Sequence, residues 1–120
     1  MNKKTLVIGG SSKPIRYSNK AIRKLIAYGH PVESIGAREA IVDFVNIITG
    51  KPKIDNIHTI TMYIGPSRQA EYYDYLLSLK PSRIIFNPGT ENPDFELIAR
   101  NKGIEVVENC TLVMLDYGLF

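Results

Sequence analysis

The chain has 120 residues, about the size of one domain, and its 44% hydrophobic and 22% charged residues are typical of a globular protein and argue against disorder. Fifteen basic and twelve acidic residues give a net charge of +3 without a basic run, so nonspecific nucleic-acid binding is not expected. No segment has the ~18 apolar residues of a membrane span, and the apolar stretch near the start is too short for a signal peptide. The one cysteine cannot form an internal disulfide, so nothing indicates an oxidising compartment. We therefore expect a single cytoplasmic domain over residues 1–120 without a membrane partner.

The first half of the chain alternates strand and helix patterns. Residues 5–8 are all β-branched or apolar, as in a strand that is covered on both faces. An amphipathic helix follows, with Ser18 as its expected N-cap and Gly29 at its C-terminal end. Two further short strands are predicted at residues 31–35 and 58–64.

The second half continues this alternation. A helix that Ser67 can cap precedes a strand at residues 83–87. Asn92 is the expected N-cap of a helix over about residues 93–102, and residues 104–107 form a further strand. This order predicts an α/β fold in three layers, a doubly wound domain with a mainly parallel sheet of about five strands and helices on both faces.

The segment from Arg38 to Asn56 has a less regular pattern. Ile41, Val42 and Val45 fit the apolar stripe of a helix, whereas the sequence VNIIT also suits a short strand. We predict a short helix followed by irregular chain in this segment.

A ligand site is expected at the carboxyl ends of the strands, where open parallel sheets bind their ligands. The first strand leads into GGSSKPIRYSN, residues 9–19, which lacks the GxGxxG spacing of a dinucleotide-binding turn. Its glycines let backbone approach a ligand, Ser11 and Ser12 can donate hydrogen bonds, and the free amides of the helix beyond Ser18 favour an anion. The turn therefore predicts a phosphate cradle, although the same residues could form only a tight turn.

The second strand ends near Arg38, where an NAD site would place a carboxylate. A guanidinium there suits a phosphorylated ribose, as in NADP or coenzyme A, unless Arg38 is only a solubilising surface residue. Two further turns rich in glycine and proline, YIGPS and FNPGTENP, follow the next strands at the same edge of the sheet. Together these turns outline one groove.

Catalytic and metal-binding patterns are not found in the sequence. His30 and His58 precede strands and so belong to the edge opposite the groove. Cys110 follows the last strand without a histidine placed to activate it, and the acidic residues lack metal-ligand spacing. We therefore predict no catalytic residue and no metal site.

The turns, taken in order, resemble those of the small stand-alone CoA-binding proteins, a Rossmann-like family similar to the CoA-binding N-terminal domain of the succinyl-CoA synthetase α subunit. The first turn matches the family pattern at Gly9, Ser11, Pro14, Arg16 and Ser18. The family's second strand typically ends in VNP before a basic residue, where this chain has Ile35, Gly36, Ala37 and Arg38. The segment TITMYIGPS resembles the strand and proline-containing turn that line the family's CoA groove. IIFNPGTENP resembles the family's aromatic-Gln-x-Gly segment, with Asn87 in the glutamine position, and VVENCTLVML resembles its C-terminal strand, cysteine and final apolar segment.

The resemblance implies a coenzyme A pyrophosphate at residues 9–19, a 3′-phosphoadenosine near Arg38 and a pantetheine arm towards residues 63–66 and 87–89. The expected cofactor-binding residues are Gly9, Gly10, Ser11, Ser12, Pro14, Arg16, Ser18, Asn19, Arg38, Tyr63, Ile64, Gly65, Pro66, Asn87, Pro88 and Gly89. The expected function is binding of coenzyme A or an acyl-CoA without ligase activity, because the ligase relatives need a phosphohistidine from a further domain. An NADP-dependent or other nucleotide-using enzyme and a purely structural or interaction protein remain as alternatives.

Overall fold

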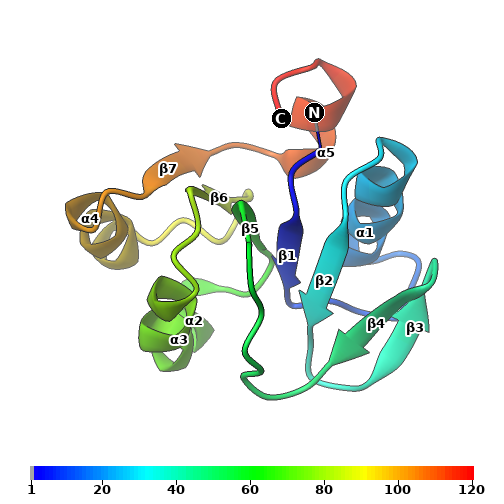
Figure 1. Cartoon of the computed structure of the whole chain (residues 1–120), viewed down its shortest axis with the longest axis horizontal. Coiled ribbons are helices and arrows are strands. Elements are labelled where there is room, and N and C mark those ends of the chain that lie inside the picture. Colours follow the sequence, from blue (N-terminus) through cyan, green and yellow to red (C-terminus); the bar gives the residue numbers. More distant parts are fainter. Residues whose placement is uncertain (1) are drawn as a thin grey trace.

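The computed structural model describes residues 2–120 and is organised around a seven-stranded sheet (Figure 1). The order of the strands across the sheet is β3-β4-β2-β1-β5-β6-β7, and every neighbouring pair is parallel except β3 with β4. The predicted α/β class with a mainly parallel sheet is confirmed, with seven strands in place of about five. The strands are β1 (Thr5–Ile8), β2 (Val32–Ile35), β3 (Ala40–Val42), β4 (Val45–Ile48), β5 (Thr59–Met62), β6 (Arg83–Phe86) and β7 (Glu105–Glu108).

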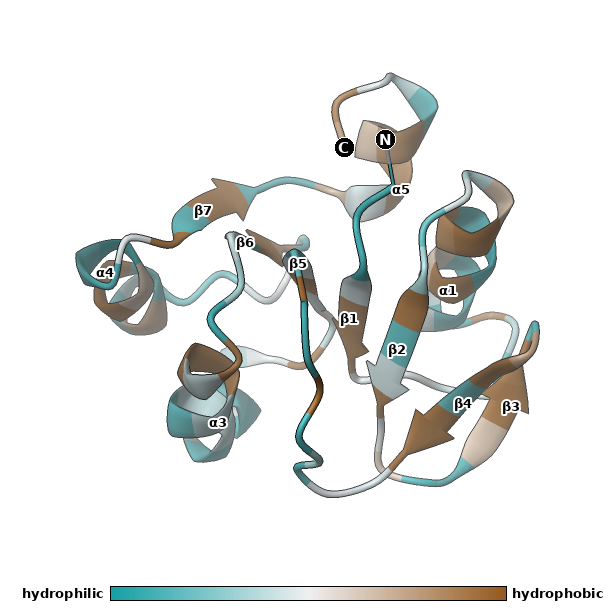
Figure 2. Cartoon of the chain, in the orientation of Figure 1, coloured by the Kyte–Doolittle hydropathy of each residue, from teal (hydrophilic) through white to brown (hydrophobic). Residues whose placement is uncertain are grey.

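Helices cover both faces of the sheet, which explains why the strands β1, β5 and β6 are buried along their whole length. Leu6 of β1 belongs to one core cluster, and the next residue, Val7, belongs to the other. The strands accordingly carry many of the apolar residues in Figure 2, whereas the helices carry both apolar and polar ones. The helices are α1 (Tyr17–Ala27), α2 (Pro66–Gln69), the 3₁₀-helix η1 (Ala70–Tyr72), α3 (Tyr73–Ser78), α4 (Pro93–Asn101) and α5 (Thr111–Asp116). Within residues 2–120, none of these helices has the length and apolar character that a membrane span requires.

The helix predicted after Arg38 is wrong, because this segment forms the antiparallel hairpin of β3 and β4 at one edge of the sheet. Val42 and Val45 are buried, whereas Ile41 is 71% exposed, so the apolar pattern follows the alternating faces of strands. The turn is formed by Asp43 and Phe44, with φ angles of 50° and 66°. Two-residue hairpin turns favour Asn-Gly or Asp-Gly at such positions, so the sequence lacked the usual hairpin signal.

Two predicted helix caps are also wrong. Helix α1 begins one residue before Ser18, whose side chain is buried, and the residue in the N-cap position is Arg16. Gly65 rather than Ser67 precedes the first residue of α2. The cap at Asn92 is confirmed, because its side chain accepts a hydrogen bond from the backbone N–H of Phe95 at 3.2 Å.

Candidate ligand-binding site

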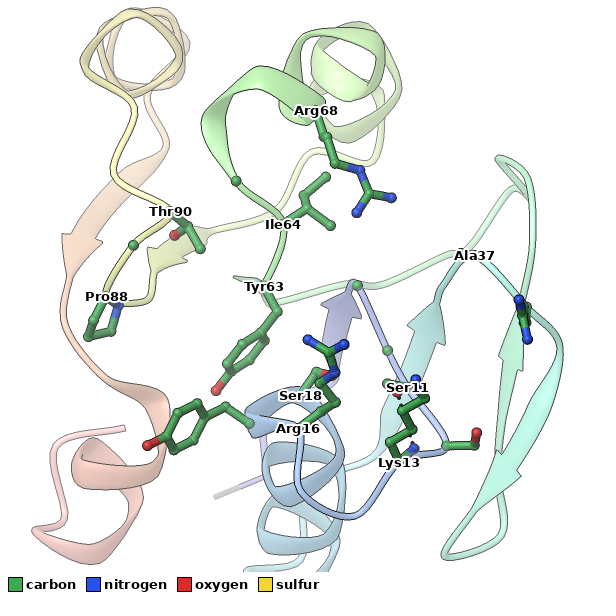
Figure 3. A pocket seen from close by; sticks show the side chains of 17 residues that line it. Ser11, Lys13, Arg16, Ser18, Ala37, Tyr63, Ile64, Arg68, Pro88 and Thr90 are labelled. Atoms are coloured by element: carbon green, nitrogen blue, oxygen red, sulfur yellow. Dashed lines mark hydrogen bonds between the residues drawn. The ribbon is translucent and has the colours of Figure 1, made fainter.

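A cavity of about 620 Å³ lies at the carboxyl ends of the central strands (Figure 3). Its walls come from the turns that follow β1, β2, β5 and β6. The strand order changes direction between β1 and β5, which is where open α/β sheets bind ligands. The lining residues are Gly9, Gly10, Ser11, Ser12, Lys13, Arg16, Tyr17, Ser18, Ala37, Arg38, Tyr63, Ile64, Gly65, Arg68, Pro88, Gly89 and Thr90.

Most of the residues expected to bind a cofactor are brought together on these walls. Four of the expected residues are not among those that line the cavity: Pro14, Asn19, Pro66 and Asn87. Five lining residues were not among those expected to bind a cofactor: Lys13, Tyr17, Ala37, Arg68 and Thr90. Four of them are adjacent in sequence to expected residues. The exception is Arg68, which lies on α2 and belongs to no motif in the sequence.

The first turn runs over the end of β2 at very short range. The backbone N–H groups of Gly9 and Gly10 both donate to the carbonyl of Ile35, at 2.8 and 3.0 Å. A Cβ atom on Gly10 would lie 2.1 Å from Ser34 Oγ, and one on Gly36 would lie 2.4 Å from the carbonyl oxygen of Gly10. The two segments can approach this closely because Gly10 and Gly36 lack side chains.

Asn19 holds the first turn against helix α1. Its side-chain amide donates to the carbonyl of Ser11 at 2.9 Å, and its oxygen accepts a bond from Arg23 Nε at 2.9 Å. Asn19 is fully buried on α1, so it connects the turn to the helix and does not line the cavity. No side chain caps the start of α1, and its first turn has no acidic residue. The amides at this end of the helix are therefore available to an anion.

The cavity is lined by positive charge without any acidic counterpart. Lys13, Arg16, Arg38 and Arg68 line it, and no aspartate or glutamate among residues 2–120 does. None of these four cations belongs to an ion pair with another residue in the described part of the chain. Figure 3 shows Arg16 and Arg68 extending from opposite sides towards the same space. This arrangement suits a ligand with several negative charges.

The wall formed by the β5 and β6 turns is mostly backbone and apolar groups. Tyr63 lines the cavity, and burial raises the pKa of its hydroxyl, with a smaller contribution from the nearby Cys110 thiol. A phenol whose pKa is raised keeps its proton at neutral pH. Asn87 is buried behind this wall, where its side chain donates to Thr61 Oγ1 and the carbonyl of Met62, at 2.7 and 2.8 Å, and accepts from the backbone N–H of Thr111 at 2.8 Å.

Both histidines lie at the opposite edge of the sheet, as expected from the sequence. His30 Nδ1 accepts a hydrogen bond from the backbone N–H of Lys3 at 2.9 Å, and His58 Nδ1 lies 2.7 Å from Thr59 Oγ1. Burial lowers the pKa of both histidines, and the nearby charges of Lys3 and Arg83 lower it further. Residues 2–120 contain no group of three or more side chains that could hold a metal ion.

Comparisons with known proteins agree with this geometry. A protein-family model described as a CoA binding domain matches residues 3–116. The crystal structure of an uncharacterized protein is 44% identical, with a TM-score of 0.97 over 100% of this chain and 99% of that one. A hypothetical protein from Pyrococcus horikoshii OT3 is 21% identical, with a TM-score of 0.86 over 98% of this chain and 84% of that one. A Thermus thermophilus protein is 22% identical, with a TM-score of 0.80 over 99% and 91% of the two chains, and these two similarities support the fold alone. A search of curated proteins found no match.

Proposed function

Because the chain belongs to the CoA binding domain family, we propose that it binds coenzyme A or an acyl-CoA in the cavity at the carboxyl ends of its strands. The observation that carries this proposal is the charge of the cavity wall, which has four cationic side chains and no acidic one. Coenzyme A carries a pyrophosphate and a 3′-phosphate, and charge-assisted hydrogen bonds to phosphate oxygens are among the strongest available to a protein.

Each part of this ligand is assigned to one wall of the cavity. The turn of residues 9–18, with Lys13, Arg16 and the start of α1, is suited to the pyrophosphate. Arg38, which follows β2, is suited to the phosphorylated ribose. The less polar wall formed by residues 63–65 and 88–90 is suited to the pantetheine arm.

Thermal unfolding in the presence of coenzyme A, acetyl-CoA, NADP and NAD tests the proposal. A ligand present at about 100 times its dissociation constant stabilises the folded protein by roughly 2.7 kcal/mol. We expect coenzyme A and acetyl-CoA to raise the melting temperature and NAD to leave it unchanged. A larger shift with NADP would favour a nucleotide-using enzyme, and the absence of any shift would favour a structural or interaction protein.

A further inference from the structure

Gln69 is fully buried behind the cavity, where it connects two of its walls. Its side-chain amide donates to the carbonyl of Ile64 at 3.0 Å and to the carbonyl of Thr90 at 2.8 Å. Ile64 and Thr90 both line the cavity, whereas Gln69 does not. One buried side chain therefore holds together the turn after β5 and the turn after β6.

The orientation of this amide is determined by its third partner. Asn92 donates from its side-chain nitrogen to Gln69 Oε1 at 3.0 Å. If the Gln69 amide were turned over, its oxygen would face two carbonyl oxygens and its nitrogen would face the Asn92 nitrogen, so only the observed orientation satisfies every partner. Asn92 is itself held by its bonds to Tyr73 and to the start of α4.

We propose that Gln69 is a positioning residue that sets the separation of the two walls along which the pantetheine arm lies. This inference depends on the function proposed above. The adenosine end of the ligand is assigned to Arg38 and the first turn, and the hydrogen bonds of the Gln69 side chain go to Ile64, Thr90 and Asn92 instead. We therefore expect Gln69 to affect the pantetheine half of the ligand more than the adenosine half.

Gln69→Met tests the inference, because methionine has a similar length and volume but cannot donate to the two carbonyls. Isothermal titration would measure the affinity of the wild type and the variant for coenzyme A and for adenosine 3′,5′-bisphosphate, which lacks the pantetheine arm. We expect Gln69→Met to weaken the binding of coenzyme A on the order of tenfold, because the two walls along the pantetheine arm are no longer held in place before the ligand binds, and to leave the binding of the bisphosphate unchanged. Gln69→Asn, which keeps the amide but cannot span both carbonyls, is the alternative variant if methionine prevents folding, and the same pattern is expected.

Thr59→Val is the matched control for lost stability. Thr59 is also fully buried, and its hydroxyl is hydrogen bonded to Arg83 and His58 at the other edge of the sheet. We expect this control to lower the melting temperature without changing the ratio of the two affinities. Equal losses for both ligands in the Gln69 variants, or no loss for either, would overturn the inference. If the wild type binds neither ligand, it is the proposed function that fails.

Discussion

Replacing Arg38 with glutamine tests the proposed ligand at the group that distinguishes coenzyme A from its dephosphorylated form. Arg38 is exposed, lines the cavity after β2 and forms no ion pair within residues 2–120. Its removal should therefore change the free energy of unfolding by no more than about 0.5 kcal/mol. Hydrogen bonds to charged groups contribute about 1.5–3 kcal/mol, so the affinity for coenzyme A should fall by roughly 10- to 150-fold.

Isothermal titration with coenzyme A and 3′-dephospho-CoA separates this contact from a general loss of positive charge. At about 0.15 M salt, where long-range effects are screened, the variant should bind 3′-dephospho-CoA almost as well as the wild type does. Arg100→Gln, which removes a 57% exposed arginine of α4 that does not line the cavity, should leave both affinities unchanged. Equal losses for the two ligands in Arg38→Gln would refute the assignment of Arg38 to the 3′-phosphate.

Two further substitutions or conditions test the turn and the opposite edge of the sheet. Gly10→Ala would place a methyl group 2.1 Å from Ser34 Oγ, so thermal unfolding should show a loss of about 1–3 kcal/mol. Gly65→Ala, with open space and a φ of −69°, should change stability little, and equal effects of the two would contradict the steric explanation. The pKa values of His30 and His58 are lowered from 6.5 in the folded state, so the unfolded chain binds more protons in the window just below pH 6.5. Stability measured by urea unfolding should therefore fall as the pH is lowered through this window, and glutamine at both positions should flatten the profile there. A profile that remains as steep in the double variant would place the cause elsewhere.

The alternation of strands and helices could be predicted because a strand that is buried on both faces appears in the sequence as a short run of mostly apolar residues. Leu6 and Val7 point to opposite cores, so both faces of β1 are buried and the strand lacks the alternation of buried apolar and exposed polar residues. The hairpin of β3 and β4 has no such distinctive run of apolar residues. The spacing of its apolar residues fits a helix as well as a strand, and the turn at Asp43 and Phe44 has positive φ angles without glycine. Such a turn is imposed by strand pairing at the sheet edge rather than by local preference.

At the site, the sequence could not predict whether a polar side chain faces the cavity or holds a turn in place. Asn19 and Asn87 were expected to bind the cofactor, yet both are buried and use their amides to hold the surrounding turns. Arg68 follows no motif but lines the cavity with no ion-pair partner in the described chain. The sequence identifies these groups as polar but cannot show whether their hydrogen-bonding capacity is used inside the protein, because that depends on contacts between distant segments. The buried amides shape the cavity and the exposed cations set its charge, so substitutions in the two groups should affect different parts of the recognition.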